Sequence, residues 1–173
     1  TYREVTDHNH YYLPFIEEYL PAIFSHLKSV SRNPFRNELN WETSWEAIGK
    51  IDWLEISEVD KKRLRADWHK IHVWTKRSSE GDEKIVSGDE SAAIQAKYYN
   101  NTFEIKTSCV AKFTLNLHPT IIDFNQPVKV NVNGKEVFNQ KVSLDKDFMA
   151  KTFIENSDRS LLWVNKILIE VEK

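Results

Sequence analysis

The stretch VKVNVNGKEVFNQKV, residues 128–142, decides the fold. Val128, Val130 and Val132 alternate with polar residues, so their side chains point to one face of a strand. The pair Asn133-Gly134 then supplies two residues that accept the positive φ angles of a type I′ turn. The stretch therefore predicts a β-hairpin with one apolar face, and a hairpin of this kind is stable in water only when other elements cover it.

Length and composition indicate about one domain with a substantial core. The chain has 173 residues, of which 40% are hydrophobic and 12% aromatic. Acidic residues number 26 and basic residues 24, which leaves a formal net charge of -2. Nucleic acids and anionic membrane surfaces are bound through a clustered basic excess, so we expect neither as a partner. No apolar run approaches the ~18 residues that would span a bilayer.

The single cysteine, Cys109, excludes a disulfide within the chain, and its place in an alternating apolar run predicts a small buried residue. The sequence begins at Thr1 rather than Met, so we expect that it is a piece of a longer protein.

An amphipathic helix is predicted near the N-terminus, over residues 13–30. Pro21 falls inside it and is expected to kink or split it. A polar linker follows over residues 29–37. The apolar stripe needs a partner, and one candidate is a second copy of the chain. The stripe is formed by side chains three or four residues apart: Ile16, Leu20, Ile23 and Leu27.

Beyond the linker the apolar period changes from that of a helix to that of a strand. A helix capped by Ser143 or Asp145 is predicted near residues 145–155. The charged segment 75–90 is predicted to be a loop. Asn100-Asn101 is predicted to be a turn, because asparagine tolerates the left-handed region. The regular spacing of the strands indicates a mainly β fold, an antiparallel immunoglobulin-like β-sandwich with an N-terminal amphipathic helix and one short late helix. The predicted strands cover residues 39–44, 51–56, 68–74, 91–99, 102–108, 110–117, 128–142 and 161–171.

Two histidine pairs are candidate metal ligands. His8 and His10 lie beside Asp7, and His69 and His72 are three residues apart. A strand over residues 68–74 would point the second pair to opposite faces, and no ligand motif accompanies either pair. We therefore expect no metal site and no cofactor. Phosphate-binding loops and the GxSxG elbow of serine hydrolases are also missing from the sequence.

The aromatic residues have two interpretations. They are either core residues or a stacking platform for a sugar. The candidates for such a platform are Trp68, Trp74, Tyr98 and Tyr99, with Trp41 and Trp45 as further candidates.

Several segments resemble the C-terminal region of bacterial α/β-hydrolase-type esterases or peptidases that carry a β-sandwich after the catalytic domain. These segments are FSHL, NWETS, IDWLEI and YYNNTFEIKTS, followed by PxxxDFxxPVxVxVNGKxVF over residues 119–138. The resemblance implies that the catalytic histidine of the parent enzyme corresponds to His10, with His8 as second choice. The nucleophilic serine and the acid would then lie upstream of Thr1.

These observations predict two regions. Residues 1–36 would be the last loop and helix of the hydrolase domain with the linker, and residues 37–173 would be an accessory β-sandwich. We expect the chain to be inactive by itself, because a general base without its nucleophile does no chemistry. Its expected partner is the upstream catalytic domain, on which it docks or whose cleft it shapes. A carbohydrate-binding module is the alternative. For the parent protein, a periplasmic or secreted location is favoured over the cytoplasm.

Overall fold

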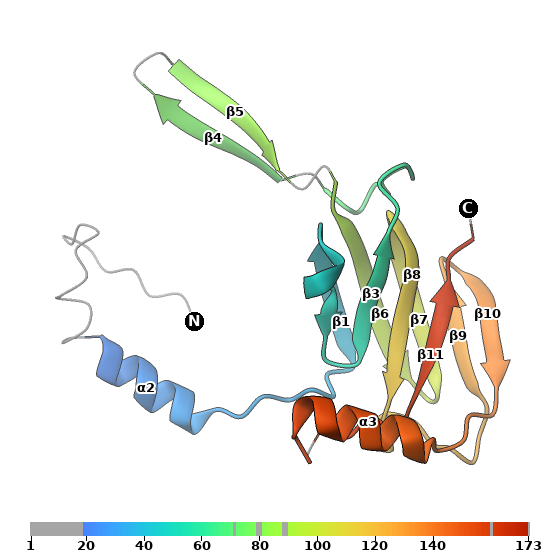
Figure 1. Ribbon diagram of the computed structural model, residues 1–173. Coiled ribbons are helices and arrows are strands. Elements are labelled where there is room, and N and C mark those ends of the chain that lie inside the picture. The colour runs from blue at the N-terminus through green and yellow to red at the C-terminus, as the bar shows by residue number, and fades with distance from the viewer. Residues whose placement is uncertain (1–18, 71, 79–80, 88–89, 160, 173) are drawn as a thin grey trace. The chain divides into compact units, whose positions relative to one another are not determined.

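The computed structural model describes residues 19–70, 72–78, 81–87, 90–159 and 161–172, and it divides the chain into two compact units (Figure 1). The first unit is Thr1–Asn33 and the second is Pro34–Lys173. The second unit therefore begins three residues before the boundary expected from the sequence. The reason is that Phe35 packs against the core and the backbone carbonyl of Arg36 accepts a hydrogen bond from the buried indole of Trp53.

Helix α2 spans Leu20–Ser29 in the first unit. Pro21 lies in its first turn, where the missing N–H is harmless, so the proline marks the start of this helix instead of a kink inside it. The part of the expected helix before residue 19, including Ile16, lies outside the described residues. None of the residues of α2 is buried.

One sheet of the second unit has five strands in the order β1-β6-β7-β9-β10. All its pairs are antiparallel except β7–β9, which is parallel. The expectation of an entirely antiparallel sandwich is wrong at this pair. The chain leaves β7, runs back through β8 in the other sheet and returns as β9 in the direction of β7. The bounds are β1 Glu38–Thr43, β6 Ala92–Tyr99, β7 Thr102–Ser108, β9 Val128–Val132 and β10 Lys135–Gln140.

The other sheet has four strands in the order β11-β8-β3-β2. The single strand expected over residues 51–56 is two strands, because Asp52 adopts a positive φ of 47° and the chain reverses there. The last strand is also shorter than expected, since it begins at Asn165. The bounds are β2 Lys50–Ile51, β3 Leu54–Val59, β8 Val110–Leu117 and β11 Asn165–Glu170, with a short 3-10 helix η1 over Glu46–Ile48.

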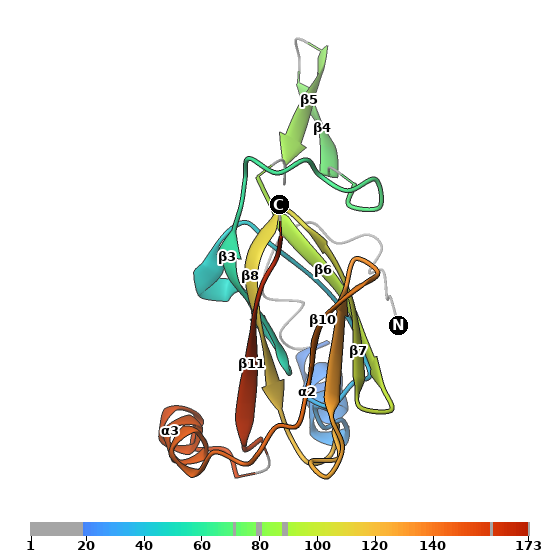
Figure 2. The same ribbon diagram turned by 90° about the vertical axis from the view of Figure 1, so that its right-hand side faces the viewer.

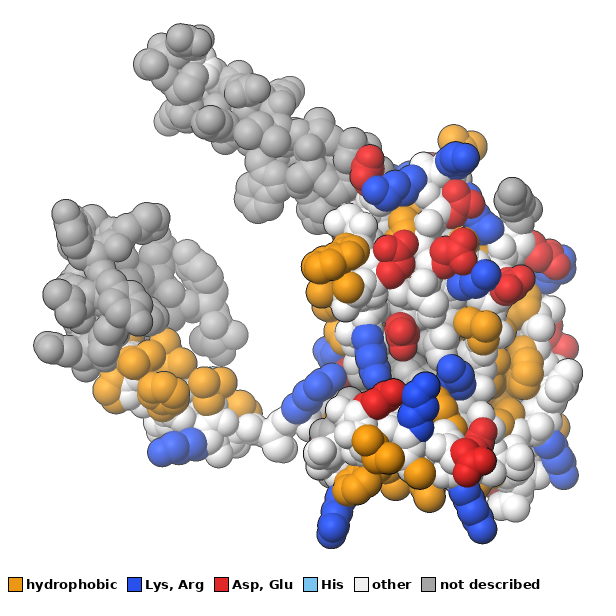
Figure 3. Space-filling model, in the orientation of Figure 1, with side chains coloured by type: hydrophobic (Ala, Val, Ile, Leu, Met, Phe, Trp, Pro, Cys, Tyr) orange, Lys and Arg blue, Asp and Glu red, His pale blue; other side chains and the backbone are white. Residues whose placement is uncertain are grey.

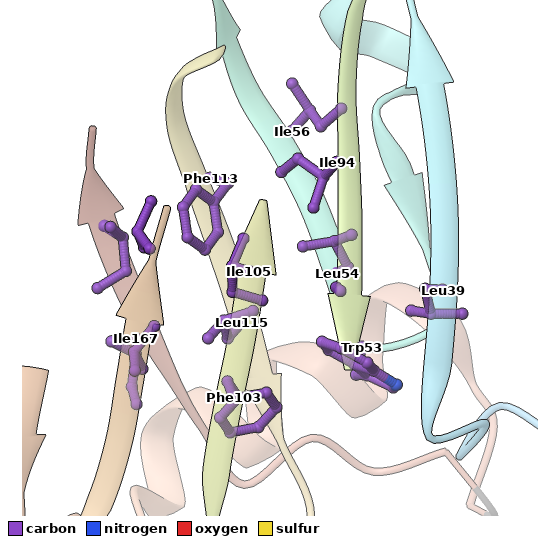
Figure 4. Close-up of a cluster of buried hydrophobic side chains, with 14 of the residues drawn as sticks. Leu39, Trp53, Leu54, Ile56, Ile94, Phe103, Ile105, Phe113, Leu115 and Ile167 are labelled. Atoms are coloured by element: carbon purple, nitrogen blue, oxygen red, sulfur yellow. The ribbon is translucent and has the colours of Figure 1, made fainter. Parts of the chain in front are cut away.

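The two sheets lie face to face as the layers of a β-sandwich (Figure 2), and inward side chains from both fill the space between them (Figure 4). Trp53, Phe103 and Phe113 are the largest of the side chains that Figure 4 labels in this core, and all three are fully buried. Cys109 is buried, as expected from the sequence.

The two turns predicted from asparagine and glycine are confirmed. Asn133 and Gly134 have φ angles of 52° and 84° and join β9 to β10. Asn100 and Asn101 have φ angles of 46° and 59° and join β6 to β7. At these turns the local backbone requirement is sufficient to locate the hairpin.

The segment expected to be a charged loop forms a hairpin instead. Strand β4 (His72–Ser78) pairs with β5 (Gly81–Ser87) in a separate two-stranded sheet. The pairing sets Val73 and Trp74 in register with Val86 and Ile85. Apolar and polar residues do not alternate regularly in this charged segment. Strand pairing does not require such alternation, so the apolar period did not predict this hairpin.

The late helix is confirmed as α3, Lys146–Asn156. Asp145 is the N-cap, and its carboxylate accepts from the backbone N–H groups of Asp147 and Phe148. The position of α3 is fixed further by Thr152, whose hydroxyl donates to the carbonyl of Trp163 at 3.1 Å.

Candidate functional site

A polar cluster forms around His69, where β6 begins and β7 ends. His69 lies in the loop between β3 and β4 and is 4% exposed. Its Nδ1 is 2.9 Å from the hydroxyl of Ser108, the last residue of β7. Its Nε2 is 3.2 Å from the hydroxyl of Ser91, which precedes β6. Because β6 and β7 are antiparallel neighbours, the two serines meet at one end of the sheet, and the loop closes over them.

Two charged side chains complete this His69 cluster. The Ser91 hydroxyl donates to Oε1 of Glu42 at 2.5 Å, and the same oxygen lies 3.1 Å from Nε2 of His69. Nη1 of Arg65 lies 2.8 Å from that nitrogen. A guanidinium only donates, so Nε2 accepts from Arg65, and Nδ1–H is left to donate to Ser108.

The His69 cluster does not have the geometry of a hydrolase triad. A triad needs an accessible nucleophile and an acid at the ring nitrogen opposite to it. Ser91 and Glu42 meet the same ring nitrogen, Nε2. Ser108 meets the other nitrogen, Nδ1, but it accepts the Nδ1–H instead of giving up its own proton, and both serines are buried. The cluster instead ties the loop that carries His69 to β1, β6 and β7.

Beside the cluster, the outer face of the five-stranded sheet is hollowed. A cavity of about 350 Å³ lies against Trp68 and His69 and extends over Asn40 and Gln95. A second cavity, of about 410 Å³, also has Asn40 and Gln95 in its wall and continues to Lys97. Since the two cavities share these residues, we treat them as one outer groove along β1 and β6.

The outer groove offers amides and balanced charge. Asn40 and Gln95 are directly opposite each other in the β1–β6 register. Among the described residues, neither side-chain amide has a hydrogen-bonding partner. Lys97 is paired with Glu38 at 2.6 Å, and this hydrogen bond raises the pKa of Lys97. Glu104 accepts from the Asn131 amide at 2.6 Å.

The other sheet presents a different outer face. Acidic and basic side chains are mixed over β3, β8 and β11 (Figure 3). Lys112 lies 3.2 Å from Glu58 and 3.5 Å from Glu170, and the hydrogen bond to Glu58 raises its pKa. This face therefore resembles an ordinary solvated surface, and we place the candidate site on the five-stranded sheet.

The structure separates the aromatic residues proposed for sugar stacking. Tyr98 faces inward: its hydroxyl donates to the carbonyl of Phe35 at 2.9 Å, and its ring meets Trp53 edge-on. Burial also raises the pKa of its phenol. Tyr98 is thus part of the core, as alternation along β6 requires. Tyr99 is 50% exposed, and Trp68 lies half-buried with its ring stacked on His69. Trp74 lies on β4, where side chains are not described.

The other candidates have mixed outcomes. His8 and His10 lie outside the described residues, so the assignment of a catalytic histidine stays a prediction. His69 and His72 do not share a strand, because β4 begins at His72 and His69 belongs to the preceding loop. Within the described residues, no group of three or more potential ligands could hold a metal ion.

Sequence reasoning missed Ser91, Ser108, Glu42 and Arg65, which come from four separate segments of the chain. It also missed Asn40 and Gln95. For these two amides a signal exists, because alternation along β1 and β6 places both on the polar face of the strand.

No family model, curated protein or solved structure matches the chain. In the part of the chain that the structure describes, no helix is both long and apolar enough to cross a membrane.

Proposed function

We propose that this chain is a non-catalytic accessory domain of an α/β-hydrolase, which docks on the catalytic domain or shapes its cleft. The observation that carries the proposal is the exposed apolar face of α2. Phe24 and Leu27 are 53% and 57% exposed, and Figure 3 shows hydrophobic side chains gathered along this helix. An amphipathic helix normally packs its apolar stripe against another surface. The last helix of a hydrolase domain would do so against that domain's sheet.

The geometry of the His69 cluster supports the non-catalytic part of the proposal. Both serines are buried. Ser91 shares its ring nitrogen with the acid, Glu42, and Ser108 accepts a hydrogen bond from His69 instead of giving it a proton. We expect the full chain to hydrolyse a short-chain aryl ester no faster than its His10→Ala variant does. Turnover by the full chain clearly above that of the variant would contradict the proposal.

Docking is tested with two variants of α2. Phe24→Glu places a charge on the apolar stripe, whereas Ser25→Glu places the same charge on the opposite face of the helix. The chain is mixed with the separately produced upstream region of its parent protein, and co-elution is measured by size-exclusion chromatography. The wild type and Ser25→Glu should co-elute with that region, and Phe24→Glu should not. Equal behaviour of all three would refute docking through this face, and concentration-dependent dimers of the chain alone would favour a second copy instead.

We also propose that the sandwich is an immunoglobulin-like variant. Two packed sheets, strands that change sheet along the chain and a buried core tryptophan, Trp53, support this type. The parallel β7–β9 pair is a departure from the usual arrangement.

A carbohydrate-binding module is the second candidate function. One observation favours it: Trp68 borders the outer groove, and Tyr99 lies on the face of β6 that lines this groove. Quenching of tryptophan fluorescence across a panel of glycans tests this function, and the absence of any response would reject it.

A further inference from the structure

We propose that the outer groove binds a neutral, linear oligosaccharide that lies along β6 between Trp68 and Tyr99. This inference rests on the second candidate function and assigns its ligand class and binding site.

The two aromatic residues mark the ends of the site. Trp68 is held by stacking on the buried His69, with ring centroids 5.8 Å apart and an interplanar angle of 29°. The His69 cluster thus provides a rigid support for one stacking platform. Tyr99 projects outward at the far end of β6. Tyr99 lies six positions after Ala93, which is at the cavity beside Trp68, and six positions correspond to about 20 Å of strand. That distance exceeds one sugar ring, so the ligand must be a chain.

The middle of the site is suited to hydroxyl groups. Asn40 and Gln95 are cross-strand neighbours, so their two amides present donors and acceptors side by side. Sugar hydroxyls both donate and accept, and an amide satisfies both roles. Aromatic faces at the ends and amides between them match the alternation of apolar and polar surface on a pyranose chain.

The charge of the outer groove argues for a neutral ligand. A polyanion such as a nucleic acid or a uronic acid polymer would require a cationic excess. The groove has none, because acidic and basic side chains are equal in number and Lys97 is already paired with Glu38. The charged residues in its wall are Glu38, Glu42, Glu104, Lys70, Lys97 and Lys106.

The test uses the full chain and isothermal titration calorimetry. The probes are β-1,4-linked glucose, xylose and mannose hexamers, α-1,4-linked glucose hexamer, the matching monomers and galacturonic acid hexamer. We expect at least one neutral hexamer to bind at least tenfold more tightly than its monomer and more tightly than the charged hexamer.

Variants then locate the site. Gln95→Ala and Trp68→Ala should each weaken binding of that hexamer about tenfold or more. Gln140→Ala removes an exposed amide from the edge strand β10, and Trp45→Ala removes an exposed indole outside the groove, so both should bind as the wild type does. Circular dichroism of each variant checks that it is folded. If Trp68→Ala fails to fold, Gln95→Ala and Asn40→Ala decide the question.

The outcomes separate the inference from the function it rests on. No binding of any probe would overturn both. A neutral hexamer whose binding is unchanged in Gln95→Ala, Asn40→Ala and Trp68→Ala would overturn this site and leave a carbohydrate-binding function elsewhere on the chain. A monomer that binds as tightly as its hexamer would overturn the linear mode, and stronger binding of the galacturonic acid hexamer would overturn the assignment of a neutral ligand.

Discussion

Replacing Gly134 with alanine isolates the backbone requirement of the β9–β10 turn. Gly134 has a φ of +84°, and a Cβ added there would meet no atom within 4 Å. The change therefore creates no clash, and only the conformational penalty remains. An L-residue in the left-handed region destabilises the folded state by about 1–2 kcal/mol. Replacing glycine also lowers the conformational entropy of the unfolded chain, which offsets this loss by about 0.4–1 kcal/mol. The net loss in the free energy of unfolding is about 1 kcal/mol, and for a chain of this size it lowers the Tm by about 2–4 °C.

Thermal unfolding followed by circular dichroism measures this shift. Gly134→Asn is the matched variant, since asparagine enters the left-handed region more easily, and its Tm should lie between those of the wild type and Gly134→Ala. Gly49→Ala provides the opposite case. The φ of −71° at Gly49 suits any residue, but the added Cβ would lie 2.2 Å from the backbone oxygen of Ile56. The Tm of Gly49→Ala should therefore fall further than that of Gly134→Ala. A Tm for Gly134→Ala equal to that of the wild type, or a Tm for Gly134→Asn below that of Gly134→Ala, would refute the reasoning.

Three further predictions concern the cap of α3, the half-buried His118 and the core. Asp145→Ala removes the N-cap of α3 and should lower the free energy of unfolding in urea by about 1 kcal/mol, whereas Ser143→Ala should change little. Burial lowers the pKa of His118 below its ordinary value of 6.5, so the folded state resists protonation. The contribution of His118 to the free energy of unfolding should therefore be full above pH 6.5 and should fall as the pH drops toward the folded-state pKa. The His118→Gln variant should lack that part of the pH dependence. Leu115→Ala opens a cavity at a fully buried position and should cost about 2–5 kcal/mol in urea unfolding, against a small effect for the exposed Leu168→Ala; similar losses for both would contradict the assignment of the core.

Local patterns predicted the elements that local physics governs. The Asn-Gly and Asn-Asn turns followed from their φ requirements, and α3 followed from its apolar spacing and capping residues. Alternation located most of the strands. It failed at Asp52, where a turn of two residues interrupts an apolar run, and over residues 75–90, where charges obscured a hairpin.

The candidate site was less predictable, because its parts come from distant segments. Trp68 and Tyr99 lie outside the core, whereas Tyr98, which was proposed with them, faces inward because it continues the apolar alternation of Ala92, Ile94 and Ala96 along β6. The His69 cluster could not be predicted, since Glu42, Ser91 and Ser108 are brought together only when β1, β6 and β7 pair.

Short stretches of sequence were enough to predict the turns at Asn100-Asn101 and Asn133-Gly134 and the apolar residues of most strands. Both properties depend on the conformational freedom of single residues and on the period of a strand, which neighbours along the chain suffice to define. The folded structure was needed to learn that β7 lies beside β9, that one sheet face is hollowed and that His69 supports Trp68. These features depend on which apolar faces pack together, and that choice is made by the whole core at once. The hairpin over residues 128–142 shows both levels: its turn is local, but its parallel partner β7 is set by packing across the sandwich.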